Sequence, residues 1–310
     1  MPPRTRLLTP VFLVALLVAA GASATAQFDL SPEQSGRVRA DKDEALVKSI
    51  PKDFHFVDEG AFTVAVAPSG VPPIASYATD AATVIGADPD IAQLVADKLG
   101  RPLKLVAVAW EDWPLGIVSG KFDAVISNVG VTEERKLKYD FSSYRQGLHG
   151  FYVRKDSPIQ KIAEPKDIAG LKIVTDPGTI QEKIIMEWDR RNHEAGLKSA
   201  EIILFDDEAA SSLALRSGRA DAVFSVNAVQ SYQAAVTGDA RLVGTVNAGW
   251  PLTTDVGVVT RRGSGIADVV TAALNETIKD GKYKQVLDKW NLGPEAIAQS
   301  HTNPPGLPKY

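Results

Sequence analysis

The chain has 310 residues, of which 45% are hydrophobic and 23% are charged, so it is long enough to form two lobes with separate cores and is not disordered as a whole. A formal net charge of -4 gives no electrostatic footprint for nucleic acid or for an anionic membrane surface. The remaining partners are small molecules and other proteins.

Residues 1–26 have the pattern of a secretory signal peptide. Two arginines precede the apolar run from Val11 to Ala20, and small residues end at Ala24-Thr25-Ala26, an Ala-x-Ala cleavage site. The apolar run is too short for a permanent membrane anchor, and the chain has no cysteine to carry a lipid or form a disulfide. We therefore expect an exported protein, cleaved near Ala26 and located in the periplasm.

The rest of the chain alternates short apolar runs with amphipathic segments, apart from its two ends. Residues 27–54 are charged and aperiodic, and we expect a loosely attached extension with one short helix. The proline-rich tail, residues 301–310, is also expected to be loose. Expected strands lie at 62–66, 103–108, 124–126, 172–174, 202–205 and 256–259, and expected helices begin near residues 88, 179, 207, 266 and 283. Asp88 is expected to cap the first of these helices.

The stretch from Ser119 to Arg135 runs from a helix end through a buried strand into a polar loop. Gly120 is expected to end the helix, and residues 124–126 form a strand covered on both faces. Asn128 and Gly130 then follow at the carboxyl end of the strand, where ligands bind in open α/β sheets. A cation in the next helical turn opposes the helix dipole, so Arg135 either points to solvent or holds an anion.

A second stretch repeats this pattern. Residues 217–225 match residues 119–127 at six positions: Ser, Gly, Asp, Ala, Val and Ser. Either a common helix-glycine-strand turn has recurred by chance, or the chain has two similar α/β lobes that each end a strand at a common cleft. We favour the two lobes.

A capping box, Thr179-Ile180-Gln181-Glu182, opens a helix after the strand at 172–174. The free backbone amides at such a helix start can receive a carboxylate or a phosphate. The alternative is a capped helix with a purely structural role.

Several short motifs follow one another in order between about residues 60 and 292. They are Val71-Pro72-Pro73, Gly86-Ala87-Asp88-Pro89-Asp90, Trp110, Ser119-Gly120-Lys121-Phe122-Asp123, Val131-Thr132-Glu133-Glu134-Arg135, Phe141-Ser142, Gly178-Thr179, Gly218-Arg219-Ala220-Asp221 and Asp280-Gly281 with Lys289-Trp290. Their order resembles the family 3 extracellular solute-binding proteins, the polar amino-acid receptors of ABC importers. The resemblance implies the type II periplasmic-binding-protein fold, an α/β fold of two lobes joined by two hinge strands, with the ligand trapped in the cleft between the lobes by closure.

The resemblance also implies domain boundaries and roles for particular residues. The signal peptide (1–26) and the extension (27–54) would precede lobe 1, which comprises residues 55–147 and 248–310, and lobe 2 comprises residues 148–247. Arg135 would clamp the α-carboxylate of the ligand, helped by Thr179 and the amide of Ile180. Trp110 would stack on the side chain of the ligand.

The site that would bind the α-ammonium group departs from the family pattern. Gly130 stands where a hydroxyl residue often lies, and Val226 stands where an acidic residue is usual. The ligand therefore either lacks an α-amino group or finds another partner for it, and arginine and lysine are not expected ligands. The residues considered as substitutes are Asn128, Ser225, Asn227 and Asp255, with Asp255 first.

We expect the periplasmic substrate-binding component of an ABC importer, which binds an amino acid or related small carboxylate and docks on a membrane permease as a monomer. The alternative is an exported dehydratase-like enzyme on the same scaffold, which would need a carboxyl general acid such as Glu182 or Glu111. The four histidines have no metal-ligand spacing, and no nucleophile or phosphate-loop motif occurs. We therefore expect no catalytic residue, no metal, no cofactor and no nucleic-acid partner.

Overall fold

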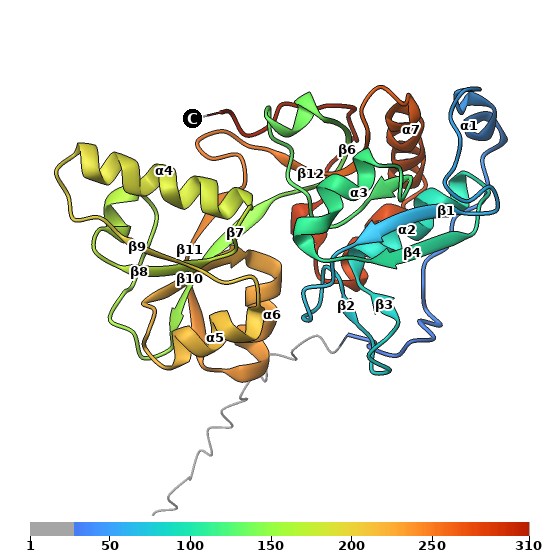
Figure 1. The fold of residues 1–310 in the computed structure, drawn as a ribbon. Helices are drawn as coiled ribbons and strands as arrows, with labels where there is room; N and C mark the ends of the chain where they lie inside the picture. The colour runs from blue at the N-terminus through green and yellow to red at the C-terminus, as the bar shows by residue number, and fades with distance from the viewer. Residues whose placement is uncertain (1–27, 310) are drawn as a thin grey trace, which may run out of the picture.

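The computed structural model describes residues 28–309, which form two five-stranded sheets and a short hairpin (Figure 1). The expected signal peptide lies outside the described residues. One sheet has the order β4-β1-β5-β12-β6, and the other has the order β11-β7-β10-β8-β9. We call the first sheet with the helices that cover it lobe 1, and the second sheet with its helices lobe 2.

Lobe 1 has helices on both faces of its sheet. Helices α1, α2, α7 and α8 contribute to the same apolar cluster as Val64 of β1 on one face, and α3 packs with Ala65 and Val125 on the other face. The strands are β1 (Phe62–Val66), β4 (Leu103–Ala107), β5 (Ala124–Val125), β6 (Tyr139–Gln146) and β12 (Asp255–Arg261), with the hairpin β2 (Ser76–Tyr77) and β3 (Val84–Ile85) beside them. The helices are α1 (Glu44–Ser49), α2 (Ala87–Lys98), α3 (Trp113–Val118), α7 (Ile266–Lys279) and α8 (Lys282–Lys289), with short 3-10 turns η1 (Trp110–Asp112), η2 (Arg135–Leu137) and η4 (Gly293–Glu295).

Lobe 2 is built in the same way. The apolar face of α4, with Ile184 and Trp188, packs on one side of the sheet, and α5 packs on the other side. The strands are β7 (Leu148–Arg154), β8 (Lys172–Thr175), β9 (Glu201–Leu204), β10 (Ala222–Val226) and β11 (Ala240–Asn247). The helices are α4 (Ile180–Glu194), α5 (Glu208–Arg216) and α6 (Asn227–Thr237), with a 3-10 turn η3 (Pro165–Ile168).

The repeated sequence unit has the same role in both lobes. In each lobe a helix ends at a glycine of positive φ, Gly120 or Gly218, both at 73°. The aspartate that follows accepts a hydrogen bond from the first residues of the neighbouring parallel strand: Asp123 from Thr63 N at 2.7 Å, and Asp221 from Lys172 N at 2.8 Å. The two sheets also share one order of parallel and antiparallel pairs, so the interpretation as two similar lobes is confirmed.

The chain crosses between the sheets twice. It passes from β6 to β7 through Gly147, and it returns from β11 to β12 through residues 248–254. The two lobes lie side by side in Figure 1, with lobe 2 on the left and lobe 1 on the right. The carboxyl ends of the parallel strands β5 and β8 lead into the loops at the boundary between the lobes, since Gly130 and Ile180 meet there.

The expected strands and helices are present, but the expected role of Asp88 is wrong. Helix α2 begins at Ala87, and its N-cap, Gly86, makes no side-chain cap bond. Asp88 is instead fully buried and accepts hydrogen bonds from Asn128 N at 2.7 Å and from the Tyr144 hydroxyl at 2.8 Å. Its carboxylate therefore positions the loop that follows β5 rather than the start of its own helix.

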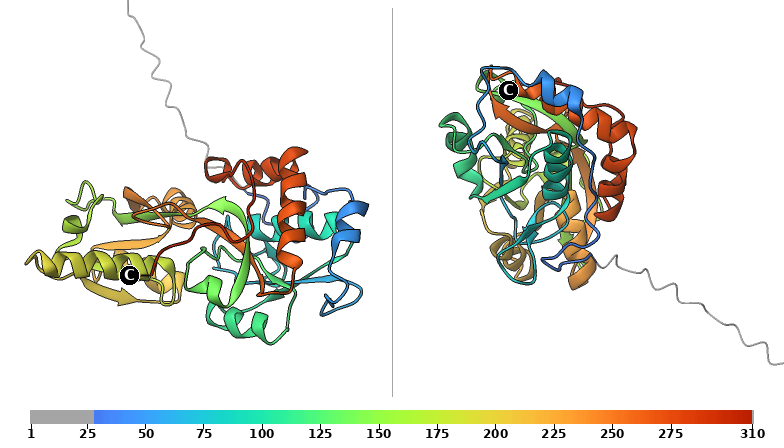
Figure 2. Two further views of the ribbon diagram at one scale, coloured as in Figure 1. Left: turned by 90° about the horizontal axis from the view of Figure 1, so that it is seen from above. Right: turned by 90° about the vertical axis from the view of Figure 1, so that its right-hand side faces the viewer.

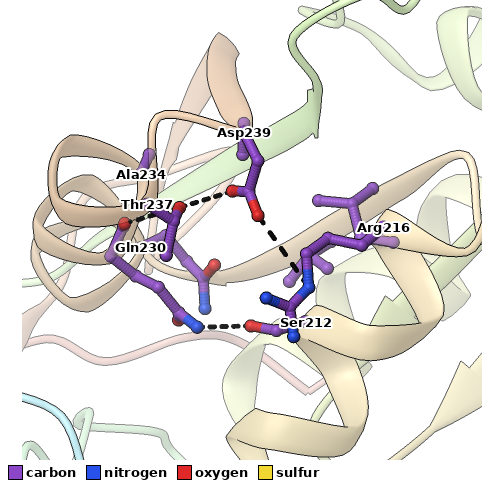
Figure 3. A pocket seen from close by; sticks show the side chains of 10 residues that line it. Ser212, Arg216, Gln230, Ala234, Thr237 and Asp239 are labelled. Atoms are coloured by element: carbon purple, nitrogen blue, oxygen red, sulfur yellow. Dashed lines mark hydrogen bonds and ion pairs between the residues drawn. The ribbon is translucent and has the colours of Figure 1, made fainter.

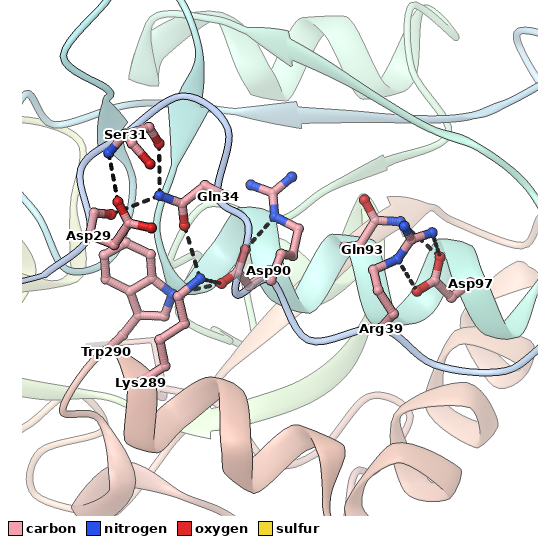
Figure 4. Close-up of polar contacts among 10 residues, drawn as sticks. Asp29, Ser31, Gln34, Arg39, Asp90, Gln93, Asp97, Lys289 and Trp290 are labelled. Atoms are coloured by element: carbon pink, nitrogen blue, oxygen red, sulfur yellow. Dashed lines mark hydrogen bonds and ion pairs between the residues drawn. The ribbon is translucent and has the colours of Figure 1, made fainter.

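The expectation of a loose N-terminal extension is also wrong. Figure 4 shows the segment lying along α2 and α8. Arg37 pairs with the buried carboxylate of Asp90 at 2.8 Å, and Arg39 pairs with Asp97 at 2.7 Å. Asp90 also pairs with Lys289 at 2.9 Å. These charged residues attach the extension to lobe 1, whereas their sequence alone reads as a solvated surface.

The C-terminal tail is ordered as well, which contradicts the expectation for residues 301–310. Leu307 is only 1% exposed, its N–H donates to Val131 O at 2.9 Å, and its carbonyl accepts from Glu133 N at 3.0 Å. Its side chain belongs to the apolar cluster of lobe 2, which includes Trp188. Figure 1 and the left view of Figure 2 both place the tail near α4. The tail therefore contacts both lobes.

Candidate functional site

Arg135 lies at the boundary between the lobes. The side-chain oxygen of Thr132 accepts a hydrogen bond from Arg135 N at 2.9 Å, which fixes the turn that carries the arginine. The guanidinium group donates to Gly130 O of lobe 1 at 2.9 Å and to Gly178 O of lobe 2 at 3.2 Å. The arginine expected to hold an anion therefore reaches both sides of the boundary.

Two tryptophans form an aromatic wall beside the guanidinium group. The rings of Trp110 and Trp113 meet edge to face at a centroid distance of 6.0 Å, and Cζ of Arg135 lies 5.7 Å from each ring centroid. Trp113 is buried in the core of lobe 1, whereas Trp110 is partly exposed and approaches Gly178 of lobe 2. Trp110 is thus the aromatic surface available to a ligand.

Gly130 and Ile180 meet across the boundary. A Cβ atom added to Gly130 would lie 2.3 Å from Cδ1 of Ile180, so any side chain there would force Ile180 to move. Thr179 caps α4 by accepting a hydrogen bond from Glu182 N at 3.2 Å, as the capping box predicts. The carboxylate of Glu182 accepts from Gly178 N at 2.6 Å, which confirms a structural role for this acid. Because residue 130 is a glycine and not the hydroxyl residue often found in the family, the side chain of Ile180 in lobe 2 can contact lobe 1.

Arg135 has no carboxylate partner in the part of the chain that the structure describes. Among residues 28–309 the guanidinium group forms no ion pair, and the neighbouring Glu134 pairs with Lys183 of lobe 2 instead. Burial lowers the pKa of Arg135 to about 10, although the nearby Tyr139 and Glu134 oppose the shift. A desolvated cation held by carbonyl oxygens and aromatic rings is a suitable receptor for a carboxylate, which guanidinium binds through two hydrogen bonds.

The side chain of Asn128 forms no hydrogen bond with Arg135 but has a partner elsewhere in lobe 1. The side-chain oxygen of Asn128 accepts a hydrogen bond from Arg145, which is 1% exposed and also pairs with Glu295. Burial raises the pKa of Asp88, which lies in the same network, to about 6, although Arg145 opposes the shift. The side chain of Asn128 is thus held inside lobe 1.

Two acids near Ser225, Asp176 and Glu208, were not predicted from the sequence as site residues. The hydroxyl of Ser225 donates to Asp176 Oδ2 at 2.8 Å, and Gln230 donates to Glu208 Oε1 at 2.6 Å. Burial raises the pKa of Asp176, and burial followed by the charges of Asp176 and Asp207 raises the pKa of Glu208 to about 7. Within the described range 28–309 neither Asp176 nor Glu208 forms an ion pair. The sequence did contain an indication that Asp176 could lie at a ligand site, because this residue directly follows a buried strand.

Asn227 and Asp255 have other partners. The side-chain oxygen of Asn227 accepts a hydrogen bond from the Tyr152 hydroxyl at 3.0 Å, beside β7 of lobe 2. Asp255 interacts with Ser143 and His301 of lobe 1, and burial raises its pKa. Neither set of partners includes Arg135 or Trp110. The structure therefore brings together Arg135, Trp110, Gly130, Thr179 and Ile180, with Ser225 on the neighbouring strand of lobe 2.

Among the described residues we found no second ligand-binding or metal-binding site comparable to the group around Arg135. A small pocket in lobe 2 lies between α5 and α6, where Arg216 pairs with Asp239 at 3.8 Å (Figure 3). No cluster of three potential metal ligands occurs within residues 28–309. None of the helices in that range is long and apolar enough to cross a bilayer.

The raised pKa of Glu208 predicts a pH-dependent effect on stability. A carboxyl group with a folded pKa near 7 and an ordinary value of 4.5 keeps its proton in the folded state but releases it in the unfolded state, so it lowers stability as pH rises between these values. Glu208→Gln should therefore raise the free energy of unfolding by up to about 3 kcal/mol at pH 8 and change it little at pH 4.

Urea denaturation at the two pH values measures this difference. Asp206→Asn is the matched control, because Asp206 is an exposed acid two positions away. An equal effect of Glu208→Gln at both pH values would show that the carboxyl group is not desolvated in the folded protein.

The geometry of the site and the comparisons with known proteins indicate the same class of protein. Two α/β lobes of one topology are joined by two crossings, and the cation at their boundary forms no ion pair with the described residues; these features define a two-lobe ligand-binding protein. The chain belongs to the bacterial extracellular solute-binding proteins, family 3, whose model matches residues 62–293. The N-terminal extension and the C-terminal tail lie outside the matched residues.

Three similar proteins illustrate the range of the relatives. The L-cystine-binding protein TcyJ of Escherichia coli (strain K12) is 28% identical over 252 residues, which cover 76% of this chain and 87% of that protein. A solved structure of an ancestral arginine-binding protein bound to arginine is 28% identical, with a TM-score of 0.65, and the match covers 74% of this chain and 98% of that one. A cyclohexadienyl dehydratase of Pseudomonas aeruginosa is 26% identical over 148 residues, which cover 47% of this chain and 52% of that protein. The expected two-lobe fold is confirmed.

Proposed function

We propose that this chain is the periplasmic substrate-binding component of an ABC importer, and that it binds an amino acid or a related small carboxylate by closure of its two lobes. The observation that carries the proposal is Arg135, a cation that has no carboxylate partner within residues 28–309 and donates to a carbonyl of each lobe. The cystine-binding and arginine-binding relatives support an amino acid as the ligand. Closure would take place about the crossings near residues 147 and 248, with a membrane permease as the partner.

A ligand screen by thermal unfolding tests the proposal. The panel consists of cystine and the twenty amino acids of proteins, together with their carboxamides, which keep the ammonium group but lack the carboxylate. A ligand present at a hundredfold its dissociation constant should stabilise the protein by about 2.7 kcal/mol. We expect stabilisation by at least one amino acid and none by its carboxamide, because Arg135 binds the carboxylate. Equal stabilisation by an acid and its amide would contradict the anion clamp.

The relatives that match most of this chain are binding proteins, and we propose that this protein also binds without chemistry. A dehydratase on this scaffold would need a free carboxyl group in the cleft. Of the two acids considered for this role, Glu182 is engaged by Gly178 N, and Glu111 is exposed at η1. Asp176 and Glu208 form no ion pair within residues 28–309, so the proposal of binding without chemistry rests on the relatives and not on a lack of acids. Chromatography of each stabilising compound after incubation with the protein should recover it unchanged.

A further inference from the structure

Charges of opposite sign occur on the two sides of the boundary, and neither sign is neutralised within the described residues. Lobe 1 contributes the guanidinium group of Arg135, and lobe 2 contributes the carboxylates of Asp176 and Glu208. A buried carboxylate without a cation loses hydration and gains only hydrogen bonds in return. The cation of lobe 1 and the acids of lobe 2 therefore each lack a counter-charge. A ligand that carries both charges can supply it.

Asp176 lies on the loop that Arg135 contacts. It is the first residue after β8, and Gly178, whose carbonyl accepts from Arg135 Nη2 at 3.2 Å, follows two positions later. The backbone carbonyl of Asp176 accepts a hydrogen bond from the Thr179 hydroxyl at 2.6 Å, which fixes this tight loop. Arg135 thus contacts the same short loop on which Asp176 lies.

The orientation of Asp176 is set by the neighbouring strand. Strands β8 and β10 are parallel neighbours, and Ser225 near the end of β10 donates to Asp176 Oδ2 at 2.8 Å. One position further, Val226 is partly buried and packs against the apolar core of lobe 1. Val226 thus makes an apolar contact where the family usually has an acid. The acid in this protein, Asp176, lies at the end of the adjacent strand β8.

We infer that Asp176, oriented by Ser225, accepts the ammonium group of the ligand, so that the ligand is a zwitterion whose carboxylate lies on Arg135. Above pH 7, where its carboxyl group is ionised, Glu208 adds to the negative potential around Asp176. The inference rests on the proposed function, since it assigns a second residue to the same ligand. It also replaces Asp255, which interacts with Ser143 and His301 instead.

Calorimetric titration with matched pairs of ligands tests the inference. Each amino acid that stabilises the protein is compared with the same compound lacking the α-amino group, for example leucine with 4-methylpentanoate and phenylalanine with 3-phenylpropanoate. The full chain should bind the amino acid of a pair about tenfold or more tightly than its partner. Asp176→Asn keeps the acceptor for Ser225 but removes the charge, so it should weaken binding of the amino acid by about tenfold and leave binding of the partner within about twofold.

Two further variants separate the possible outcomes. Ser225→Ala should produce a smaller loss of the same selective kind, and Asp206→Asn, an exposed acid nearby, should have no effect. Arg135→Lys should weaken both members of a pair; if it does not, the proposed anion clamp fails rather than the ammonium site. The inference is overturned if no amino acid binds, if the unmodified protein binds both members of a pair equally, or if Asp176→Asn retains the preference for the amino acid.

Discussion

Replacing Arg135 with lysine should weaken ligand binding by about tenfold or more while leaving the melting temperature of the free protein nearly unchanged. The guanidinium group can present two parallel N–H donors to a carboxylate, whereas an ammonium group acts as a point charge. The free protein should be little affected, because the guanidinium group of Arg135 forms two hydrogen bonds to carbonyl oxygens and no ion pair within residues 28–309, and a lysine also keeps a cation beside Trp110 and Trp113.

Arg262→Lys is the matched control for this experiment. Arg262 also donates to a backbone carbonyl, that of Leu137, but it is exposed and belongs to lobe 1 away from Gly178. Calorimetric titration of both variants with the same amino acid compares the two sites. If Arg135→Lys and Arg262→Lys both retained the unmodified affinity, Arg135 would not be the anion clamp.

Truncating Leu307 to alanine should lower the free energy of unfolding by about 2–4 kcal/mol, the range for a fully buried leucine. The side chain is 1% exposed within the apolar cluster of lobe 2, so its removal leaves a cavity next to Ile180 and Trp188. The backbone hydrogen bonds of Leu307 to Val131 and Glu133 do not depend on the side chain, so the loss measures packing alone.

Leu252→Ala serves as the comparison in urea denaturation. Leu252 lies in the second crossing between the lobes and is 60% exposed, so its truncation should cost less than about 0.5 kcal/mol. If the two truncations had the same small effect, Leu307 would not be part of the core in solution.

Local patterns predicted most of the fold. Short apolar runs identified the strands, and the helix-glycine-strand unit identified both lobes, because caps and buried strands depend on neighbouring residues. The group around Arg135 could also be predicted, since the residues lie at strand and helix ends where polar groups face a ligand. The position of Trp110 beside Arg135 follows the resemblance to the family.

The errors concern residues whose partners are far away in the sequence. Asp88 has a sequence context suited to a helix cap, but its partners Asn128 and Tyr144 lie 40 and 56 positions away. Asp176 and Glu208 come together only because β8 and α5 lie in the same lobe, which no periodicity shows. The prolines of the tail indicated a loose segment, yet one buried leucine and a few backbone hydrogen bonds are sufficient to attach it.

The order of the strands also determines how the two lobes form. All five strands of lobe 2 come from one continuous segment, residues 148–247, whereas β12 lies between β5 and β6 in the sheet of lobe 1 and follows that segment in the chain. Contacts between distant parts of a chain require the closure of long loops, which slows their formation. Lobe 2 can therefore assemble its whole sheet from one continuous segment, while lobe 1 remains divided until the chain has passed through lobe 2 and returned.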